Sequence, residues 1–193
     1  DSRILSAAMR QRAIESIMVP TVQGMKAEGT PFKGFLYAGL MMTSAGPKLL
    51  EFNARFGDPE TQEVLPLLDA DLLEIVKDCA DGRGPGGMLP RKPGAAVGVV
   101  LAAEGYPDKP RTGAAIDLTA LDGEKDVLVF HAGTMKAGAG WTATGGRVLA
   151  VVGLGADVAA ARERAYQAVS RVAAPALQRR SDIAAKVMGR ATA

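Results

Sequence analysis

Residues 1–29 carry a helical pattern of apolar and polar positions. Apolar side chains recur every three or four residues from Ile4 to Met18, and charged side chains such as Arg10 lie on the opposite face. The pattern predicts an amphipathic helix that Pro20 interrupts and Gly29 stops. Because the chain enters this helix at once and does not begin with methionine, we interpret it as an internal helix of a larger protein.

A strand pair and a second helix are predicted next. Residues 33–43 are apolar on both faces, which is typical of a buried central strand. Residues 44–47 are turn formers, so residues 48–53 are expected to return as an antiparallel neighbour. Apolar positions over residues 59–80 recur at helical spacing and predict one helix with a kink near Pro66.

Residues 81–94 are rich in glycine and proline and separate helical from strand-like patterns. We therefore predict a first domain over residues 1–80, a linker over 81–94 and a small second domain over 95–193. The second domain is expected to contain a helix over 157–172 and strands over three ranges: 95–103, 127–131 and 147–152. The expected class is α+β, an antiparallel sheet with flanking helices followed by a domain of mostly antiparallel strands.

The composition excludes several classes of protein. The 193 residues are 48% hydrophobic and 23% charged, which is enough to bury one sizeable core or two small ones. A net charge of +2 with dispersed basic residues argues against a nucleic acid partner. No apolar run reaches the length of a membrane span, and no signal peptide opens the chain, so no membrane partner is expected. The single cysteine, Cys79, fits a reducing compartment, and the cytoplasm is the expected location.

Glu51, Asn53 and Arg55 form the most informative polar pattern. Because successive side chains of a strand point to opposite faces, these three are expected on one face. Their apolar neighbours are expected on the other, packed face: Leu50, Phe52 and Ala54.

A carboxylate beside an amide oxygen suits a hard divalent cation such as Mg²⁺. Arg55 can bind a phosphate or carboxylate through two parallel hydrogen bonds. The alternative interpretation of the same pattern is the solvated face of an edge strand with a surface ion pair.

The residues that follow predict a turn and a helix start. Asp58 is expected to be the N-cap, with Pro59 at the first helical position and Glu60 in the first turn. Helix capping is sufficient to explain why these residue types occur here. The same turn also directs the free N–H groups of a helix N-terminus at the site of Glu51 and Asn53.

Residues 55–62 read RFGDPETQ and, with Glu51 and Asn53, closely resemble the signature of the phosphoribosylamine–glycine ligases, or glycinamide ribonucleotide synthetases, of the ATP-grasp superfamily. The resemblance covers nearly the whole chain and fades after about Ala173. It implies the C-terminal part of an ATP-grasp fold, without the N-terminal part of the enzyme. Further matching segments are GFLYAGLM (34–41), GYP (105–107), FHAGT (130–134) and GGRVL (145–149).

The resemblance implies ATP-dependent ligation of glycine to 5-phosphoribosylamine, through a glycyl phosphate, in purine biosynthesis. It implies Glu51 and Asn53 as ligands of Mg²⁺ or Mn²⁺ that bridge the ATP phosphates. Arg55 is then the clamp on the transferring phosphate. Asp58 and Glu60 are implied to orient the amine or Arg55.

Gly145, Gly146 and Arg147 suggest a second anion contact. Two glycines permit close approach of the backbone, and the arginine supplies positive charge. The resemblance favours the phosphate of the phosphoribosyl group as the bound anion, and a tight turn with a surface arginine is the alternative. His131, the only histidine, is interpreted as a hydrogen-bonded structural residue rather than an acid–base catalyst.

Two rival functions remain from the sequence. E-x-N-x-R by itself is shared by other ATP-grasp carboxylate–amine ligases and carboxylases. A noncatalytic module that retains the fold is the second rival. The groups that hold adenine are expected upstream, so the isolated chain is expected not to turn over ATP.

Overall fold

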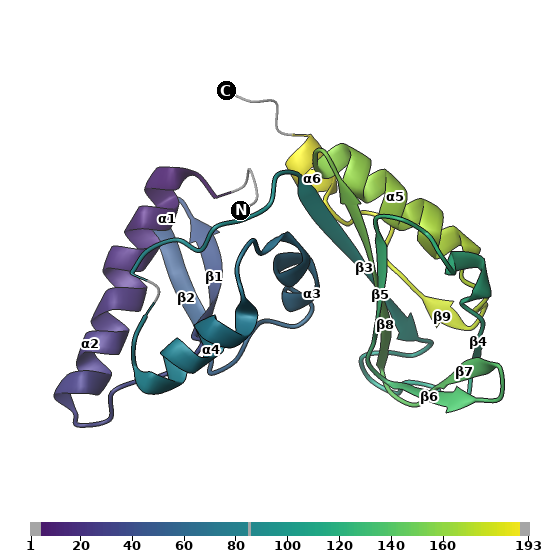
Figure 1. The fold of residues 1–193 in the computed structure, drawn as a ribbon, viewed down its shortest axis with the longest axis horizontal. Coiled ribbons are helices and arrows are strands. Elements are labelled where there is room, and N and C mark those ends of the chain that lie inside the picture. Colours follow the sequence, from purple (N-terminus) through teal and green to yellow (C-terminus); the bar gives the residue numbers. More distant parts are fainter. Residues whose placement is uncertain (1–4, 85, 190–193) are drawn as a thin grey trace. The chain divides into compact units, whose positions relative to one another are not determined.

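A computed structural model describes residues 5–84 and 86–189, which form two compact units (Figure 1). Unit 1 runs up to Asp58 and continues from Leu68 to Arg91. Unit 2 holds Pro59–Leu67 and the described residues from Lys92 onward. The predicted linker over 81–94 stays a prediction, and its Pro85 lies outside the described residues.

Unit 1 begins with one long helical stretch of three segments: α1 (Ala7–Ala13), the π-helical turn η1 (Ile14–Met18) and α2 (Val19–Ala27). The Ser6 side chain caps α1 by accepting a hydrogen bond from the Met9 N–H. The helical stretch continues past Pro20, so the predicted interruption takes the form of a local change of helix type. Pro20 lies in the first turn of α2, directly after the π-helical turn in which the hydrogen-bond ladder shifts. The predicted start at Ile4 lies outside the described residues.

The hairpin of unit 1 contains a β-bulge. It consists of two antiparallel strands: β1 (Tyr37–Thr43) and β2 (Gly46–Asn53). Gly39 pairs with Glu51 but Leu40 pairs with Leu49, so Leu50 is the extra residue of the bulge.

The hairpin corrects two predictions about burial. Residues 33–43 do not form a buried central strand, because the strand begins at Tyr37, the sheet has two strands, and the strand residues are half-buried or exposed. The predicted packed face of Leu50, Phe52 and Ala54 is wrong at two of these residues: Leu50 is 65% exposed, and Ala54 is exposed as well. The bulge removes Leu50 from the regular alternation of the strand.

The single helix predicted over residues 59–80 is wrong. The structure has three segments there: α3 (Thr61–Val64), the 3₁₀ helix η2 (Leu65–Leu67) and α4 (Leu72–Asp81). Pro66 lies in η2, and Leu68 then forms an antiparallel bridge with Arg91. Asp71 starts α4 anew, because its carboxylate accepts hydrogen bonds from two backbone N–H groups of the first turn.

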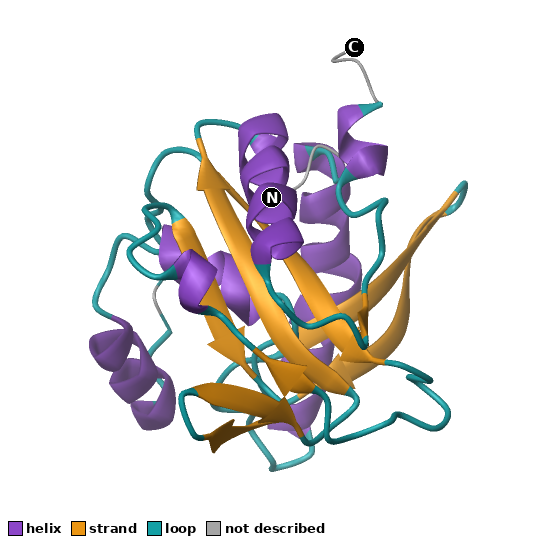
Figure 2. Cartoon of the chain, turned by 90° about the vertical axis from the view of Figure 1, so that its right-hand side faces the viewer, coloured by secondary structure: helices purple, strands orange, loops and turns teal. Residues whose placement is uncertain are grey.

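The main sheet of unit 2 has the strand order β5-β8-β3-β9 and is antiparallel throughout (Figure 2). Its strands are β3 (Ala95–Ala103), β5 (Val127–His131), β8 (Arg147–Gly155) and β9 (Leu177–Gln178). The predicted strands over 95–103 and 127–131 are confirmed, and the one over 147–152 extends to Gly155. The expected α+β class with antiparallel sheets is confirmed.

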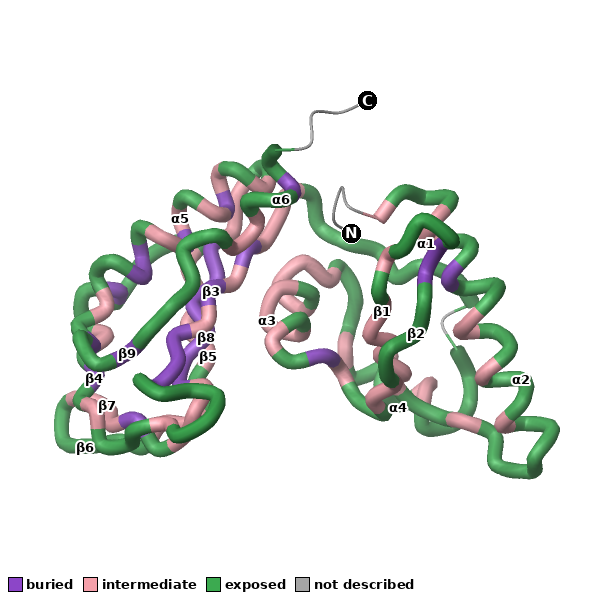
Figure 3. Tube along the Cα trace, turned by 180° about the vertical axis from the view of Figure 1, so that it is seen from behind, coloured by how far each residue is buried: buried purple, intermediate pink, exposed green. Residues whose placement is uncertain are grey.

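The helix α5 (Val158–Arg171) covers this sheet, and the Asp157 side chain caps it. Its inward face carries the buried residues Ala161, Ala165 and Val169. The helix lies very close to β8: a Cβ atom at Gly153 would be 2.4 Å from the Ala161 carbonyl oxygen. Buried residues accordingly gather on β3, β8 and α5 (Figure 3).

A second sheet of unit 2 has the order β4-β7-β6. The remaining elements of the unit are β4 (Ala115–Ile116), the 3₁₀ helix η3 (Thr119–Leu121), β6 (Thr134–Ala137), β7 (Gly140–Ala143) and α6 (Ala185–Met188). None of the helices described in either unit is both long enough and apolar enough to cross a membrane.

Candidate active site

Glu51 and Asn53 lie side by side at the end of β2. The Asn53 amide nitrogen Nδ2 donates a hydrogen bond of 3.0 Å to Glu51 Oε1. The strand alternation therefore brings the two side chains together, as the sequence predicted. Glu51 is exposed and Asn53 is half-buried, so both side chains can be reached from solvent.

Arg55 continues this row of polar side chains. Its Nη2 donates to Asn53 Oδ1 at 3.2 Å, and its Nη1 donates to the Phe56 carbonyl oxygen at 2.7 Å. The Phe56 ring stacks on Phe35, with ring centroids 4.0 Å apart. The aromatic pair thus holds the backbone at Phe56, whose carbonyl oxygen accepts the hydrogen bond from Arg55. This limits the positions that the charged guanidinium of Arg55 can take.

The pair of Glu51 and Asn53 has the chemistry of an open magnesium site. It combines a carboxylate with an amide, two ligand types that suit a cation that keeps water or phosphate in its other positions. The amide nitrogen of Asn53 faces Glu51 and its Oδ1 accepts from Arg55, so a shared cation would need the amide to present its oxygen to Glu51 instead. Over residues 5–84 and 86–189, no group of three or more histidine, cysteine, aspartate or glutamate side chains could hold a metal ion. Two ligand side chains fit an open site completed by a nucleotide, rather than a closed cage.

The helix predicted to start at Pro59, with Glu60 in its first turn, begins later in the structure. α3 has four residues and begins at Thr61, and its N-cap is Glu60, with no hydrogen bond from a capping side chain. Asp58 belongs to unit 1 and Glu60 to unit 2. The assigned helix start thus lies after the predicted N-cap Asp58, and capping by Asp58 and a catalytic role of either residue stay predictions.

Side chains have little space at Gly145 and Gly146. A Cβ atom at Gly145 would be 3.2 Å from the Gly133 Cα atom, and one at Gly146 would be 2.6 Å from Cδ2 of Tyr106. Arg147 opens β8, and its carbonyl oxygen accepts a hydrogen bond from the Gly133 N–H at 3.0 Å. Packing is thus one reason for both glycines, and the anion contact stays a prediction.

The same contacts join three motifs that are far apart in the sequence. Tyr106 comes from GYP, Gly133 from FHAGT, and Gly145 and Gly146 from GGRVL. Sequence reasoning did not foresee the contact of Tyr106 with Gly146, because no periodicity connects residues forty positions apart.

His131 makes the hydrogen bond that the sequence interpretation expected. Its Nδ1 lies 2.9 Å from Thr134 Oγ1, and its ring packs on Trp141 with centroids 4.0 Å apart. Lys136 Nζ lies 4.6 Å from the centroid of the Trp141 ring. Burial, and secondly the positive charge of Lys136, lower the pKa of His131 below its ordinary value of 6.5.

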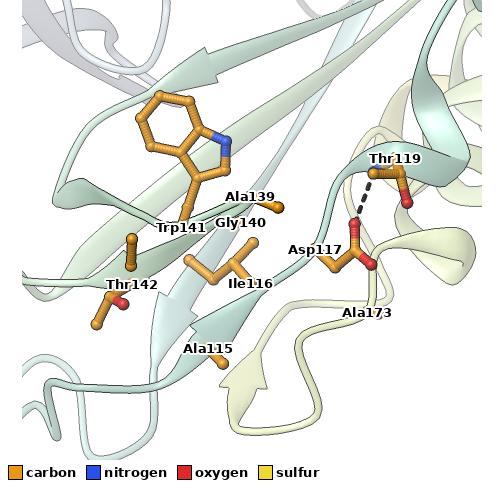
Figure 4. A pocket seen from close by; sticks show the side chains of 10 residues that line it. Ala115, Ile116, Asp117, Thr119, Ala139, Gly140, Trp141, Thr142 and Ala173 are labelled. Carbon is orange, nitrogen blue, oxygen red and sulfur yellow. Dashed lines mark hydrogen bonds between the residues drawn. The ribbon is translucent and has the colours of Figure 1, made fainter.

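A hollow of about 340 Å³ lies beside β4 and β7 in unit 2 (Figure 4). Ile116 and Trp141 line it, together with Asp117. The Asp117 carboxylate accepts a 2.9 Å hydrogen bond from the Thr119 N–H, which lowers the pKa of Asp117. That carboxylate is occupied in holding its own turn, so we assign the hollow no catalytic group.

Two sequence models of one family match the chain. The model described as Phosphoribosylglycinamide synthetase, ATP-grasp (A) domain, matches residues 2–61, which include Glu51, Asn53 and Arg55. The model described as Phosphoribosylglycinamide synthetase, C domain, matches residues 96–186.

The chain is similar to proteins named phosphoribosylamine–glycine ligase. The one from Caulobacter vibrioides is 48% identical over 182 residues, which are 93% of this chain and 43% of that protein. The one from Streptomyces coelicolor is 46% identical over 184 residues, which are 91% of this chain and 43% of that protein. The chain thus spans 43% of the length of these relatives.

The fold agrees with solved structures. The crystal structure of phosphoribosylamine–glycine ligase from Thermotoga maritima matches with a TM-score of 0.78 and 36% sequence identity. The match covers 92% of this chain and 44% of the Thermotoga maritima chain. The biotin carboxylase domain of Hydrogenobacter thermophilus 2-oxoglutarate carboxylase has a TM-score of 0.63 at 16% identity, which supports the shared fold alone. Matches of both domain models and of these relatives establish that the chain belongs to the phosphoribosylglycinamide synthetase family of ATP-grasp proteins.

Proposed function

We propose that this chain supplies part of the catalytic site of an ATP-dependent ligase that joins glycine to 5-phosphoribosylamine. The products are glycinamide ribonucleotide, ADP and phosphate, in purine biosynthesis. The observation that carries the proposal is the 3.0 Å contact between Glu51 and Asn53, with Arg55 bonded to the same amide. The named relatives support the choice of substrates.

The chemistry requires activation of glycine, because a carboxylate oxygen is a poor leaving group. A glycine carboxylate oxygen attacks the γ-phosphorus of ATP, ADP leaves, and glycyl phosphate forms. The amine of phosphoribosylamine then attacks the glycyl carbonyl carbon, the C–O bond to phosphate breaks, and the amine proton is lost. Charge gathers on the transferring phosphoryl group, so catalysis depends on stabilising that charge.

Each residue of the candidate site has a role in this scheme. Glu51 and Asn53 hold Mg²⁺ or Mn²⁺, which shields the phosphate charges of ATP when bound. Arg55 binds the transferring phosphoryl group, and its hydrogen bonds to Asn53 and Phe56 hold its guanidinium ready. Asp58 and Glu60 orient the incoming amine or Arg55.

A second part of the proposal concerns the phosphoribosyl phosphate. Gly145, Gly146 and Arg147 contact this phosphate through backbone N–H groups and the guanidinium. Their close packing against Gly133 and Tyr106 fixes the backbone there. A rigid loop that offers an arginine is suited to binding a phosphate, because little conformational entropy is lost when the phosphate binds.

The nucleotide site needs a partner segment outside this sequence. The ATP-grasp match covers residues 2–61, and unit 1 leaves large apolar side chains exposed, such as Leu73 at 75%. We propose that the upstream part of the ligase packs against unit 1 and holds adenine. The chain alone is then expected to show no ATP turnover.

Glycine dependence of ATP hydrolysis tests the function. In the full-length protein, ADP release in the presence of phosphoribosylamine should require glycine and should not respond to bicarbonate or formate. Glu51→Ala should lower the rate by several orders of magnitude, about what loss of a metal ligand at a phosphoryl-transfer site costs. Glu28→Ala, at the exposed end of α2, is the matched control and should retain the wild-type rate. A near-normal rate in Glu51→Ala would exclude the metal role.

A bicarbonate-dependent rate would instead favour an ATP-grasp carboxylase. The observation behind this second candidate is the fold shared with the biotin carboxylase domain of Hydrogenobacter thermophilus 2-oxoglutarate carboxylase. No turnover with any of the three acids, in a protein that is fully folded, would favour a noncatalytic module.

A further inference from the structure

We propose that Gly39 is a positioning residue for the cation site, because Cγ of Glu51 lies against the space of its missing side chain. This inference rests on the proposed function, since it assumes that Glu51 binds the cation. Gly39 lies on β1, outside the row of polar side chains on β2, and it has no chemical group of its own to offer.

The strand register brings the two residues together. Gly39 is the direct partner of Glu51 in the antiparallel hairpin. A Cβ atom at Gly39 would lie 3.2 Å from Cγ of Glu51, closer than an ordinary van der Waals contact. Cγ of Glu51 therefore lies against β1 at Gly39, where an added side-chain atom would press on it.

Glu51 is held at a second point. Its Oε1 accepts the 3.0 Å hydrogen bond from Asn53, so the methylene group rests at Gly39 while one carboxylate oxygen is fixed. The other oxygen, Oε2, is then directed by two restraints rather than one. A carboxylate fixed in this way pays less conformational entropy when it binds a cation.

The neighbouring bulge explains why the restraint is needed. Leu50 is the extra residue beside the pair of Gly39 and Glu51, and a bulge locally increases twist and weakens the ladder. Without a firm ladder, the direction of Glu51 depends on what its side chain touches. An alanine at position 39 would press on Cγ of Glu51 and shift it by a few tenths of an ångström relative to Asn53.

Direct cation binding tests this role. The free Mn²⁺ signal in electron paramagnetic resonance, recorded with ATP and the full-length protein, reports the affinity without turnover. Gly39→Ala should weaken Mn²⁺ binding about 10-fold or more, as for other changes that misdirect a metal ligand. Gly24→Ala is the matched control, because nothing lies within 4 Å of a Cβ atom there and the residue is in the same unit. An unchanged affinity in Gly39→Ala would overturn the inference.

A double-mutant cycle separates this role from a general effect on folding. Gly39→Ala should lower the urea midpoint when Glu51 is present and should leave it unchanged or raise it in a Glu51→Ala background. Equal shifts in both backgrounds, or a double variant that does not fold, would contradict a role that acts through Glu51. Normal Mn²⁺ binding by Glu51→Ala would contradict the proposed function, because Glu51 would then not be a metal ligand. Normal binding by Gly39→Ala together with weakened binding by Glu51→Ala would contradict this inference alone.

Discussion

Gly133 and Gly145 pack backbone to backbone in unit 2. A Cβ atom at Gly133 would lie 2.7 Å from the Gly145 Cα atom and 2.8 Å from the Arg147 carbonyl oxygen. Both contacts are to main chain, which cannot move aside as the end of a flexible side chain can. The turn after β5 and the start of β8 are therefore fitted to each other by the absence of side chains.

Gly133→Ala is expected to destabilise unit 2 by about 1–3 kcal/mol, because the added methyl group forces the backbone of two segments apart. Urea denaturation monitored by the fluorescence of Trp141 measures this change. Gly87→Ala, where nothing lies within 4 Å of the added atom, is the control and should leave the midpoint nearly unchanged. Equal stability of the two variants would refute the close contact.

Tyr166→Phe is expected to loosen the C-terminal segment. The Tyr166 hydroxyl donates to the Arg180 carbonyl oxygen at 2.9 Å and accepts from the Ile183 N–H at 3.1 Å. Loss of the hydroxyl should cost about 1 kcal/mol and speed hydrogen exchange of the Ile183 amide. Arg162 still donates to carbonyl oxygens of the same segment, so global unfolding should change little. An unchanged exchange rate of the Ile183 amide in Tyr166→Phe would contradict the role of the Tyr166 hydroxyl in holding the C-terminal segment.

His131 should titrate below the ordinary pKa of a histidine. Burial and the charge of Lys136 lower its pKa from 6.5, so the unfolded chain binds this proton more readily than the folded one. The contribution to stability is thus present above the unfolded pKa and is lost as pH falls through the folded pKa. Because the chain has one histidine, its Cε1–H resonance in an NMR titration gives the value directly.

Lys136→Gln isolates the two causes of this pKa shift. Removal of the charge should raise the pKa of His131 part of the way, and the larger effect of burial should remain. A titration midpoint at or above 6.5 in the unaltered protein would contradict the packing of His131 on Trp141.

Arg55→Lys is expected to lower glycine-dependent ATP hydrolysis by about 10²-fold in the full-length protein. Lysine keeps the charge, but a single ammonium group cannot bond Asn53 Oδ1 and the Phe56 carbonyl oxygen in the planar arrangement of the guanidinium. Arg83→Lys is the control, since Arg83 pairs with Asp78 and Asp81 at the surface of the same unit. Wild-type rates in Arg55→Lys would mean that charge alone suffices there.

Local patterns predicted the parts of the fold that local forces determine. The apolar runs over 95–103 and 127–131 became strands within those bounds, because their small and β-branched side chains suit a sheet buried on one or both faces. The two-residue period likewise predicted that Glu51 and Asn53 would meet.

Contacts between distant segments account for what the pattern could not predict. The helix predicted over 59–80 is broken where Leu68 bridges to Arg91, a partner twenty-three positions away, and where Asp71 offers a competing cap. The exposure of Leu50 likewise follows from a bulge whose position depends on the opposite strand. Periodicity carries no information about either partner.

Hydrogen exchange is expected to differ sharply between the two units of this chain. Among the described residues, unit 1 buries only Ala13, Gly46, Pro47 and Gly57, whereas unit 2 buries a continuous core on β3, β8 and α5. Since burial of apolar surface is the main stabilising contribution, amides of β1, β2 and α4 should exchange by local opening, and those of β3 and β8 only by global unfolding. Mass spectrometry measures the exchange of both units, in the chain alone and in the full-length protein. Protection of unit 1 should rise in the longer protein, because the upstream part covers side chains such as Leu73. Unit 1 amides that are as protected as those of β8 in the chain alone would contradict the proposal that an upstream segment completes this unit.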